Sequence, residues 1–224
     1  MPKKSILNLT SLKDQVYEYI RRQMKSGKLK PGETIDMKAT SQMLGVSITP
    51  LRDALIRLEM EGFVKILPRR GVIVNELTVQ DIQDFYRILG ALESTAIIAA
   101  GEFLDDSDIQ KMENLNDEME KALARDDFNT YYEKNLQFHD VFLILSGNHL
   151  LHEMVATLKK RLYDFPRRAG YVKEWEESSV GEHAQLLVFL RQKKFLEAAN
   201  YIRDIHWSFR VQKKFIEKYY QEGL

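Results

Sequence analysis

Three histidines in the second half of the chain are spaced so that they could share one metal ion. His139 lies four residues after Asn135 in a helical apolar pattern, so both side chains leave the same face of one predicted helix. His183 and His206 fall on the apolar faces of two further predicted helices. Buried imidazoles need partners, and one divalent ion would satisfy three of them together. The alternative is that each histidine is a hydrogen-bonded core residue, and the pattern leaves both interpretations open.

A second group of residues, in the first third of the chain, could contact DNA. Ser47, Thr49 and Arg52 lie at the start of a predicted helix, where free N–H groups favour phosphate and side chains reach base edges. Arg69 and Arg70 form a loop between two short predicted strands and suit a minor groove or its flanking phosphates. The alternative is a small helical domain whose arginines are only solvated.

The elements around these basic residues follow the order of a winged helix-turn-helix. The expected elements are helices at about 12–26 and 37–44, a third helix from Thr49, and strands at 63–67 and 71–74. Gly45 supplies the sharp corner between the second and third helices, because glycine adopts the left-handed conformation without strain. We expect Thr49 to cap the third helix and Pro50 to occupy its first position.

From Thr78 onward the apolar period is helical throughout. The pattern predicts helices at about 78–101, 106–125, 127–146, 148–169, 174–192 and 194–221. A run of helices without a strand pattern is typical of an antiparallel all-α bundle, part of whose apolar face is expected to meet a second copy. The fold class is therefore mainly α, with a DNA-binding domain at 1–75 and a helical effector-binding and dimerisation domain at 76–224.

Composition and charge limit the classes of protein to which this chain can belong. A chain of 224 residues with 44% hydrophobic residues can bury two cores, and the absence of cysteine excludes a disulfide framework and thiolate chemistry. The sequence has neither an apolar stretch of membrane-spanning length nor a signal-peptide pattern, so we expect a cytoplasmic protein. Residues 1–75 carry 14 Lys and Arg against 7 Asp and Glu, whereas residues 76–224 carry 19 against 26. A net charge of +7 favours polyanion binding by the first part.

The segment GVSITPLRDALIRLEMEGFVKILPRRGVIV, with SGKLKPGE upstream, resembles the signature of GntR-family transcription regulators. The resemblance covers residues 10–75 and implies DNA contacts at Lys38, Ser47, Thr49, Arg52 and Gly71. The family usually has a guanine-reading arginine where this chain has Ile48, which cannot form the bidentate hydrogen bond to guanine but could pack on a thymine methyl. We therefore expect an operator that differs from the usual guanine-bearing one.

LQFHDVFLILSGNHLL, the GEH at 181–183 and the His206 helix resemble the all-helical FCD domain of the FadR-like branch of this family. In its metal-binding members an Asp four residues before the first histidine joins three histidines around a divalent ion, usually Zn²⁺ or Ni²⁺. The resemblance implies the ligands Asn135, His139, His183 and His206 here. Asparagine in place of aspartate removes one negative charge, so we expect weaker metal binding. His149 and His152 match no ligand of the family.

The same resemblance implies a small carboxylate effector that fills open positions on the metal. Many members carry an arginine four residues before the glutamate of an LE pair. That pair is Leu92-Glu93 here, and Leu89 occupies the arginine position. Effector contacts are therefore assigned to the region of Leu89 and Glu93, with Arg161 as the candidate replacement cation. Arg161 flanks a predicted apolar stripe of Leu158, Leu162 and Phe165.

These observations predict a homodimeric, sequence-specific DNA-binding regulator, expected to be a repressor, whose operator affinity changes when the carboxylate binds at or near the metal. One alternative is a metal-dependent, hydrolase-like enzyme, because three histidines with an open position also describe a catalytic zinc site. Neither a general base nor a nucleophile motif accompanies them in the sequence. The other alternative is a regulator whose bundle only dimerises, with no metal and no effector.

Overall fold

The computed structural model describes residues 11–68, 70–164 and 172–221, and the chain divides into two compact units. The first comprises Met1–Leu77 with Lys160–Arg168, and the second comprises Thr78–Lys159 with Ala169–Leu224. Each unit has its own buried apolar core.

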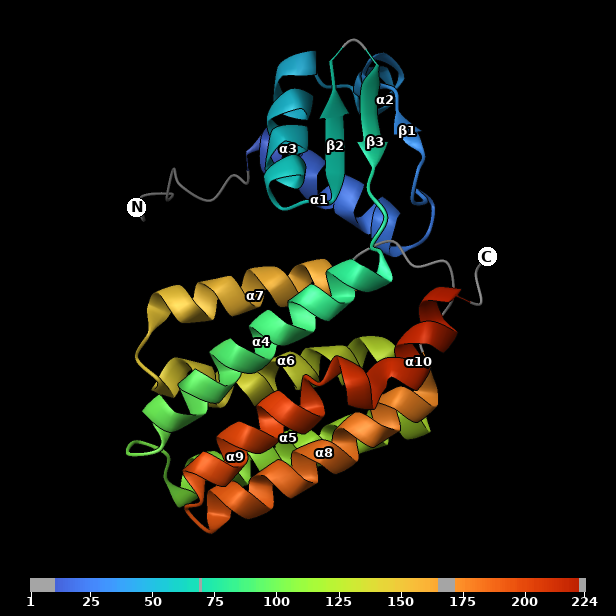
Figure 1. The fold of residues 1–224 in the computed structure, drawn as a ribbon. Helices are drawn as coiled ribbons and strands as arrows, with labels where there is room; N and C mark the ends of the chain where they lie inside the picture. Colours follow the sequence, from blue (N-terminus) through green and yellow to red (C-terminus); the bar gives the residue numbers. More distant parts are fainter. Residues whose placement is uncertain (1–10, 69, 165–171, 222–224) are drawn as a thin grey trace, which may run out of the picture. The chain divides into compact units, whose positions relative to one another are not determined.

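The first unit is a three-helix arrangement with a small sheet (Figure 1). Its elements are α1 (Leu12–Lys25), β1 (Thr34–Ile35), α2 (Met37–Leu44), α3 (Ile48–Met60), β2 (Val64–Leu67) and β3 (Gly71–Val74). The apolar face of α3 packs on α1, and the four residues of its predicted stripe are buried, namely Leu51, Ala54, Leu55 and Leu58. The strands β2 and β3 form an antiparallel hairpin, and β1 pairs with the other edge of β3, giving the order β1-β3-β2. The two-residue strand β1 was not predicted.

The corner between α2 and α3 forms as the sequence predicts, but the cap of α3 does not. Gly45 has φ of 65° and ends α2 in the left-handed conformation. The predicted positions of Thr49 and Pro50 were wrong, because α3 begins at Ile48 with Ser47 as its N-cap residue. Pro50 still lies in the first turn, where a backbone N–H has no helical partner and its loss is tolerated.

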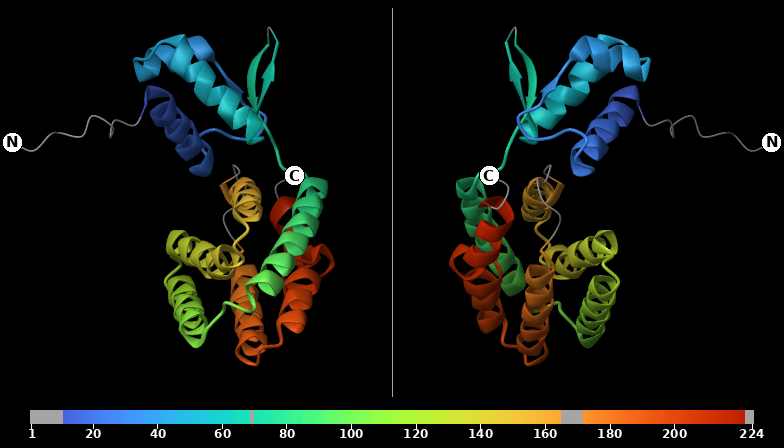
Figure 2. Two further views of the ribbon diagram at one scale, coloured as in Figure 1. Left: turned by 90° about the vertical axis from the view of Figure 1, so that its left-hand side faces the viewer. Right: turned by 90° about the vertical axis from the view of Figure 1, so that its right-hand side faces the viewer.

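The second unit is a helical bundle, as predicted (Figures 1 and 2). Its helices are α4 (Val79–Ala100), α5 (Asp106–Ala124), α6 (Phe128–Leu145), α7 (His149–Asp164), α8 (Lys173–Arg191), α9 (Phe195–Tyr201), the π-helical η1 (Ile202–His206) and α10 (Phe209–Gln221). Residues 149–159 of α7 belong to this unit, and the rest of that helix groups with the first. The helix α5 packs on α6 and α8, while α4 packs on α6, α9, η1 and α10. Capping boxes at Thr78–Asp81 and Asp105–Asp108 define the starts of α4 and α5.

The single helix predicted at 194–221 is wrong. The segment consists of α9, a π-helical turn and α10, with Trp207 and Ser208 between the last two. Gly90 on α4 allows η1 to come close, since an added Cβ there would lie 3.2 Å from Trp207 Cβ and 3.4 Å from Arg203 Cα. The π turn places His206 and Trp207 side by side in the core, where both are buried.

None of the helices in the described ranges is both long enough and apolar enough to span a membrane.

Candidate metal centre

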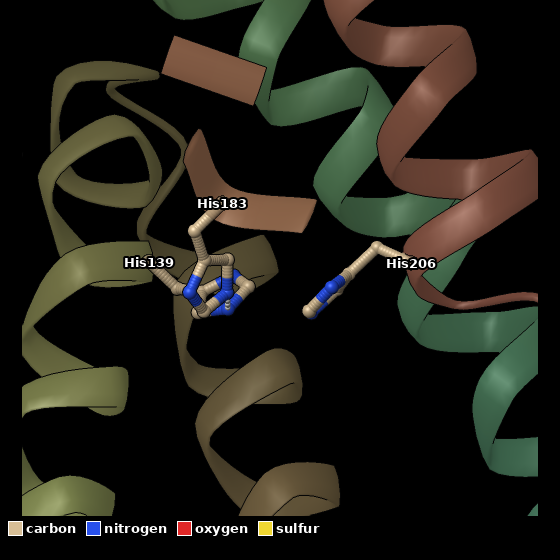
Figure 3. A group of neighbouring side chains, drawn as sticks. All are labelled: His139, His183 and His206. Atoms are coloured by element: carbon tan, nitrogen blue, oxygen red, sulfur yellow. Dashed lines mark hydrogen bonds between the residues drawn. The ribbon is translucent and has the colours of Figure 1, made fainter. Parts of the chain in front are cut away.

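The three predicted histidines converge in the core of the second unit (Figure 3). One nitrogen from each of His139 on α6, His183 on α8 and His206 on η1 lies within 4.8 Å of the others. The Nε2 atoms of His139 and His183 are 3.2 Å apart. Two imidazole nitrogens that bind one Zn²⁺ at about 2.1 Å would be separated by about 3.0–3.4 Å at the usual coordination angles. The spacing of His139 and His183 therefore fits a shared ion, and His206 offers a nitrogen within 4.8 Å of both.

Two buried carboxylates set the orientation of two of the rings. Glu93 Oε2 lies 2.8 Å from His139 Nδ1, and Glu182 Oε2 lies 2.8 Å from His206 Nδ1. Because a carboxylate accepts hydrogen bonds, each histidine donates from Nδ1, and the neutral ring then presents the Nε2 lone pair to the centre. This carboxylate–histidine pairing is the usual support of a metal-binding imidazole.

Two polar atoms beside these rings lack a hydrogen-bond partner among the described residues. They are Asn135 Oδ1 and His183 Nδ1, and both residues are buried, with Asn135 4% exposed and His183 fully covered. An unpaired buried acceptor costs about 1–3 kcal/mol. Asn135 lies one helical turn before His139, and its buried oxygen has the chemistry of a metal ligand, so its role as the fourth ligand stays a prediction.

Burial keeps His139 and His183 neutral, the form that binds a metal. Burial lowers the pKa of His139 to about 3, although the Glu93 carboxylate acts in the opposite direction. Burial and the neighbouring His206 and His139 rings hold the pKa of His183 well below its ordinary value. No proton therefore has to be displaced from these two rings at neutral pH.

Sequence reasoning missed the groups that support Glu93. The ammonium of Lys159, on α7, lies 2.7 Å from Glu93 Oε1, and the indole of Trp207 donates to Glu93 Oε2 at 2.7 Å. Burial alone would raise the pKa of Glu93, but its contacts with His139 and Lys159 hold it well below the usual range. Both oxygens of Glu93 are thus occupied by protein groups, and its evident role is to orient His139.

The sequence analysis did not place Lys159 in the core because it assigned the wrong residues to the apolar face of α7. The sequence suggested Leu158, Leu162 and Phe165, whereas the buried residues are Leu151, Val155, Lys159 and Leu162. Phe165 lies outside the described residues. Lys159 continues the i, i+4, i+8 spacing from Leu151 and Val155, so this spacing could have predicted a lysine on the buried face of the helix.

Glu182 and Gln212 form a second supporting pair that the sequence did not reveal. Gln212 on α10 donates from Nε2 to Glu182 Oε1 at 2.7 Å, while the other oxygen of Glu182 holds His206. His149 begins α7 on the surface, and His152 contacts Asp140 at 2.9 Å. Among the described residues, the group that could hold an ion is His139, His183 and His206.

The proposed effector contacts remain predictions. Leu89 is fully buried and apolar, so α4 offers no cation at this position. Arg161 belongs to the part of α7 that groups with the first unit.

The residues assigned to DNA contacts lie mostly on the surface of the first unit. Those described as exposed are Lys38, Ser47, Ile48, Thr49, Arg52 and Arg70. Ile48 is 37% exposed at the start of α3, where an apolar side chain would otherwise be expected to point inward. Gly71 is half-buried with φ of 93°, a conformation that favours glycine. Arg69 lies outside the described residues, and the DNA contacts themselves remain predictions.

Comparison with known families decides the class of this protein. Residues 84–205 match the FCD domain, and residues 12–74 match the bacterial regulatory proteins of the gntR family. The chain belongs to the FCD branch of the GntR family. This GntR-family chain is 29% identical over 162 residues to the regulator McbR of Escherichia coli K12, covering 72% of this chain and 73% of McbR. It is 26% identical over 181 residues to the regulator YdhC of Bacillus subtilis, covering 80% of each chain.

Solved structures agree with the fold of this GntR-family member. Escherichia coli McbR/YncC superposes with a TM-score of 0.68 and 26% identity, covering 96% of this chain and 99% of that one. A GntR regulator from Rhodococcus sp. RHA1 gives a TM-score of 0.66 at 18% identity, over 96% and 98% of the two chains. These relatives are all named transcriptional regulators, so the chain is a DNA-binding transcriptional regulator and not the hydrolase-like enzyme considered as an alternative.

Proposed function

We propose that this regulator is a homodimeric repressor whose affinity for its operator is controlled by a small carboxylate bound at a divalent metal, Zn²⁺ or Ni²⁺. The metal ligands are Asn135, His139, His183 and His206. The metal would supply open coordination positions for the carboxylate oxygens.

The observation that carries this proposal is the convergence of three buried imidazoles from three separate elements on one point. Their supporting carboxylates, Glu93 and Glu182, reach two of the Nδ1 atoms and leave the Nε2 atoms directed inward. If this core had only a packing role, apolar residues would stabilise it at least as well as Glu93 and Glu182, because buried charged groups are costly to desolvate.

The dimer and the direction of control are argued from the geometry of DNA and from a relative. Two recognition helices must enter major grooves about one turn of DNA apart, which a symmetric dimer achieves. RspR of Escherichia coli K12, 25% identical over 145 residues, is named a transcriptional repressor. Control by an effector requires that the carboxylate bind one arrangement of the dimer better than the other.

The test measures metal, effector and operator in one preparation. Untagged protein is first analysed for bound metal, then stripped and titrated with Zn²⁺ and Ni²⁺ in competition with a chromophoric chelator. Operator DNA is obtained by selection from random sequence, and its affinity is measured by fluorescence anisotropy with and without metal and a panel of small carboxylates. We expect about one metal per chain and a fall in operator affinity of tenfold or more with one class of carboxylate.

His183→Ala removes one ligand and should abolish metal binding while leaving operator affinity in the absence of carboxylate close to that of the wild type. The matched control, His152→Ala, removes a histidine that contacts Asp140 at 2.9 Å, outside the three-histidine group. Operator binding with no metal uptake by the wild type would instead support a bundle that only dimerises.

A further inference from the structure

Lys159 is a buried charged residue of this core that is not one of the proposed metal ligands. Its side chain is 2% exposed, on a helix whose other inward residues are apolar. Removing an ammonium from water costs several kcal/mol, and a well-packed apolar residue at such a place is often neutral or more stable. A lysine here therefore calls for a role beyond packing.

The ammonium of Lys159 has hydrogen-bonding capacity left over. It carries three N–H donors, and within the described part of the chain its oxygen partner is Glu93 Oε1 at 2.7 Å. Its other contact is the face of the Trp207 ring, with Nζ 5.4 Å from the ring centroid. Donors without acceptors in a buried place favour an additional anionic or carbonyl oxygen.

The same indole ring lies against the histidines. The centroid of Trp207 is 6.1 Å from that of His139 and 5.1 Å from that of His206. Lys159 and the histidines thus surround one aromatic side chain from different elements, and Glu93 links the ammonium to His139 through its two oxygens. An oxygen near Lys159 and an oxygen at the three-histidine point could belong to one small molecule.

The charges of the core limit what that molecule can be. Lys159 and Glu93 cancel, Asn135 contributes no charge, and Glu182 contributes one negative charge beside His206. A divalent ion would leave this group with a net charge of +1. In a buried site an uncompensated charge is costly, so one negative charge on the ligand gives the best balance.

We propose that Lys159 is the cation that anchors the effector in this chain, in place of an arginine at Leu89, and that the effector is a small monocarboxylate. This inference rests on the proposed metal-dependent regulation. It adds a specificity-determining residue on α7 and a charge class for the ligand.

The experiment uses full-length protein loaded with Zn²⁺ and butyrate as the probe, with binding followed by isothermal titration calorimetry. Lys159→Met alone would leave the Glu93 carboxylate buried without its counter-charge, and removing one partner of a buried ion pair destabilises a fold by about 3–5 kcal/mol. The informative comparison is therefore between Glu93→Gln and the pair Glu93→Gln with Lys159→Met, which differ only in the ammonium. Metal content of each variant is measured separately by chelator competition.

We expect the double variant to bind butyrate at least tenfold more weakly than Glu93→Gln at equal zinc occupancy, and Lys159→Arg to stay within threefold of the wild type. Lys134→Met, which removes a lysine paired with Glu118 on the surface, is the matched control and should not change butyrate affinity. Equal butyrate affinity in the two Glu93→Gln variants would overturn the role of Lys159.

Succinate, with the same carbon number and two carboxylates, tests the charge class. We expect it to bind at least tenfold more weakly than butyrate, and tighter succinate binding would overturn the monocarboxylate assignment. Failure of the wild type to bind zinc, or to bind either acid once zinc is bound, would count against the proposed function itself and is distinct from a failure of Lys159 alone.

Discussion

Asn135 is the residue that we propose sets how strongly the three-histidine site holds a cation. Its side chain is buried one turn before His139, and its oxygen has no hydrogen-bond partner among the described residues. An amide oxygen can coordinate a metal, but it adds no charge to balance a divalent ion. With Asn135 as the proposed fourth ligand, every proposed ligand side chain is one that binds a metal in its uncharged form.

Asn135→Asp should tighten zinc binding by about tenfold or more, equivalent to ~1.4 kcal/mol, because a charged ligand then faces the cation in a poorly solvated core. Competition with a chromophoric chelator measures this change. Asn129→Asp adds the same charge at an exposed position of α6 and should alter zinc affinity less than twofold. Equal affinities for the wild type and Asn135→Asp would argue that residue 135 is not a ligand.

Ile48 is the residue at which we expect the DNA preference of this protein to depart from that of its family. An exposed isoleucine at the start of α3 can contact a thymine methyl but cannot donate two hydrogen bonds to guanine. We expect Ile48→Arg to gain about 1–3 kcal/mol of preference for guanine at one position of each half-site.

Selection from random DNA, run in parallel on the wild type and Ile48→Arg, checks the prediction about Ile48. Met43→Arg, at a 64% exposed position of α2, adds the same charge away from the start of α3 and should raise affinity without a new base preference. Recovery of the guanine-bearing operator by the wild type would contradict the prediction.

At the scale of elements, the site depends on the close packing of α4 against the interrupted helix that carries His206. The π turn of η1 changes the direction of side chains relative to a continuous helix, and Gly90 leaves room for it. A regular helix over 194–221 has a different angular spacing along this segment. The unpredicted interruption is thus part of what brings His206 to His139 and His183.

Replacing a helical glycine by alanine raises helix propensity at any site, but its effect on packing depends on the space around the new Cβ. Gly181→Ala on α8, with no atom within 4 Å of the added Cβ, should stabilise the protein by about 0.5–1 kcal/mol. Gly90→Ala gains the same propensity but meets Trp207 Cβ and the Arg203 backbone, and overpacking costs about 1–3 kcal/mol, so we expect a net loss of up to ~2 kcal/mol. Urea denaturation of the metal-free variants measures both, and equal stabilisation by the two alanines would show that η1 can move away freely.

At the scale of the whole molecule, the two parts of the chain differ in net charge and in their content of buried histidines. The chain is neutral overall, yet residues 1–75 carry +7 and residues 76–224 carry −7. The positive net charge of residues 1–75 attracts the negatively charged phosphates of DNA. The acidic part contains all five histidines, of which three are buried in one core, so we expect its stability to depend on pH.

Metal-free protein should lose stability as the pH falls below about 6.5, where the histidines of the unfolded chain begin to bind protons. The native pKa of His139 is about 3, so between these values the unfolded state binds more protons and acid favours unfolding. Each such histidine contributes a slope of about 1.4 kcal/mol per pH unit. The contribution of His139 is measured by urea denaturation of the wild type and His139→Gln in the presence of EDTA. The urea midpoints of the two proteins are compared at pH 7.5 and at pH 5.5. A pH dependence that is the same in both proteins would contradict the buried, neutral assignment.

The sequence by itself determined the class of protein and most of its elements. Helical periodicity and Gly45 placed the helices of the winged domain, because local backbone preference and apolar spacing act over a few residues. The family resemblance singled out the three histidines, which lie 44 and 23 residues apart along the chain. Their inward phase on each helix was readable from neighbouring apolar residues.

Only the tertiary structure placed the groups that support those histidines. Glu93, Lys159, Glu182 and Trp207 come from different helices, and no local pattern indicates that they meet. The break at η1 was equally hidden, because a π turn depends on what packs against it rather than on helix propensity. Local sequence therefore indicated the residues that could bind a metal, whereas the orientation and charge of the site arise from contacts between elements distant in the chain.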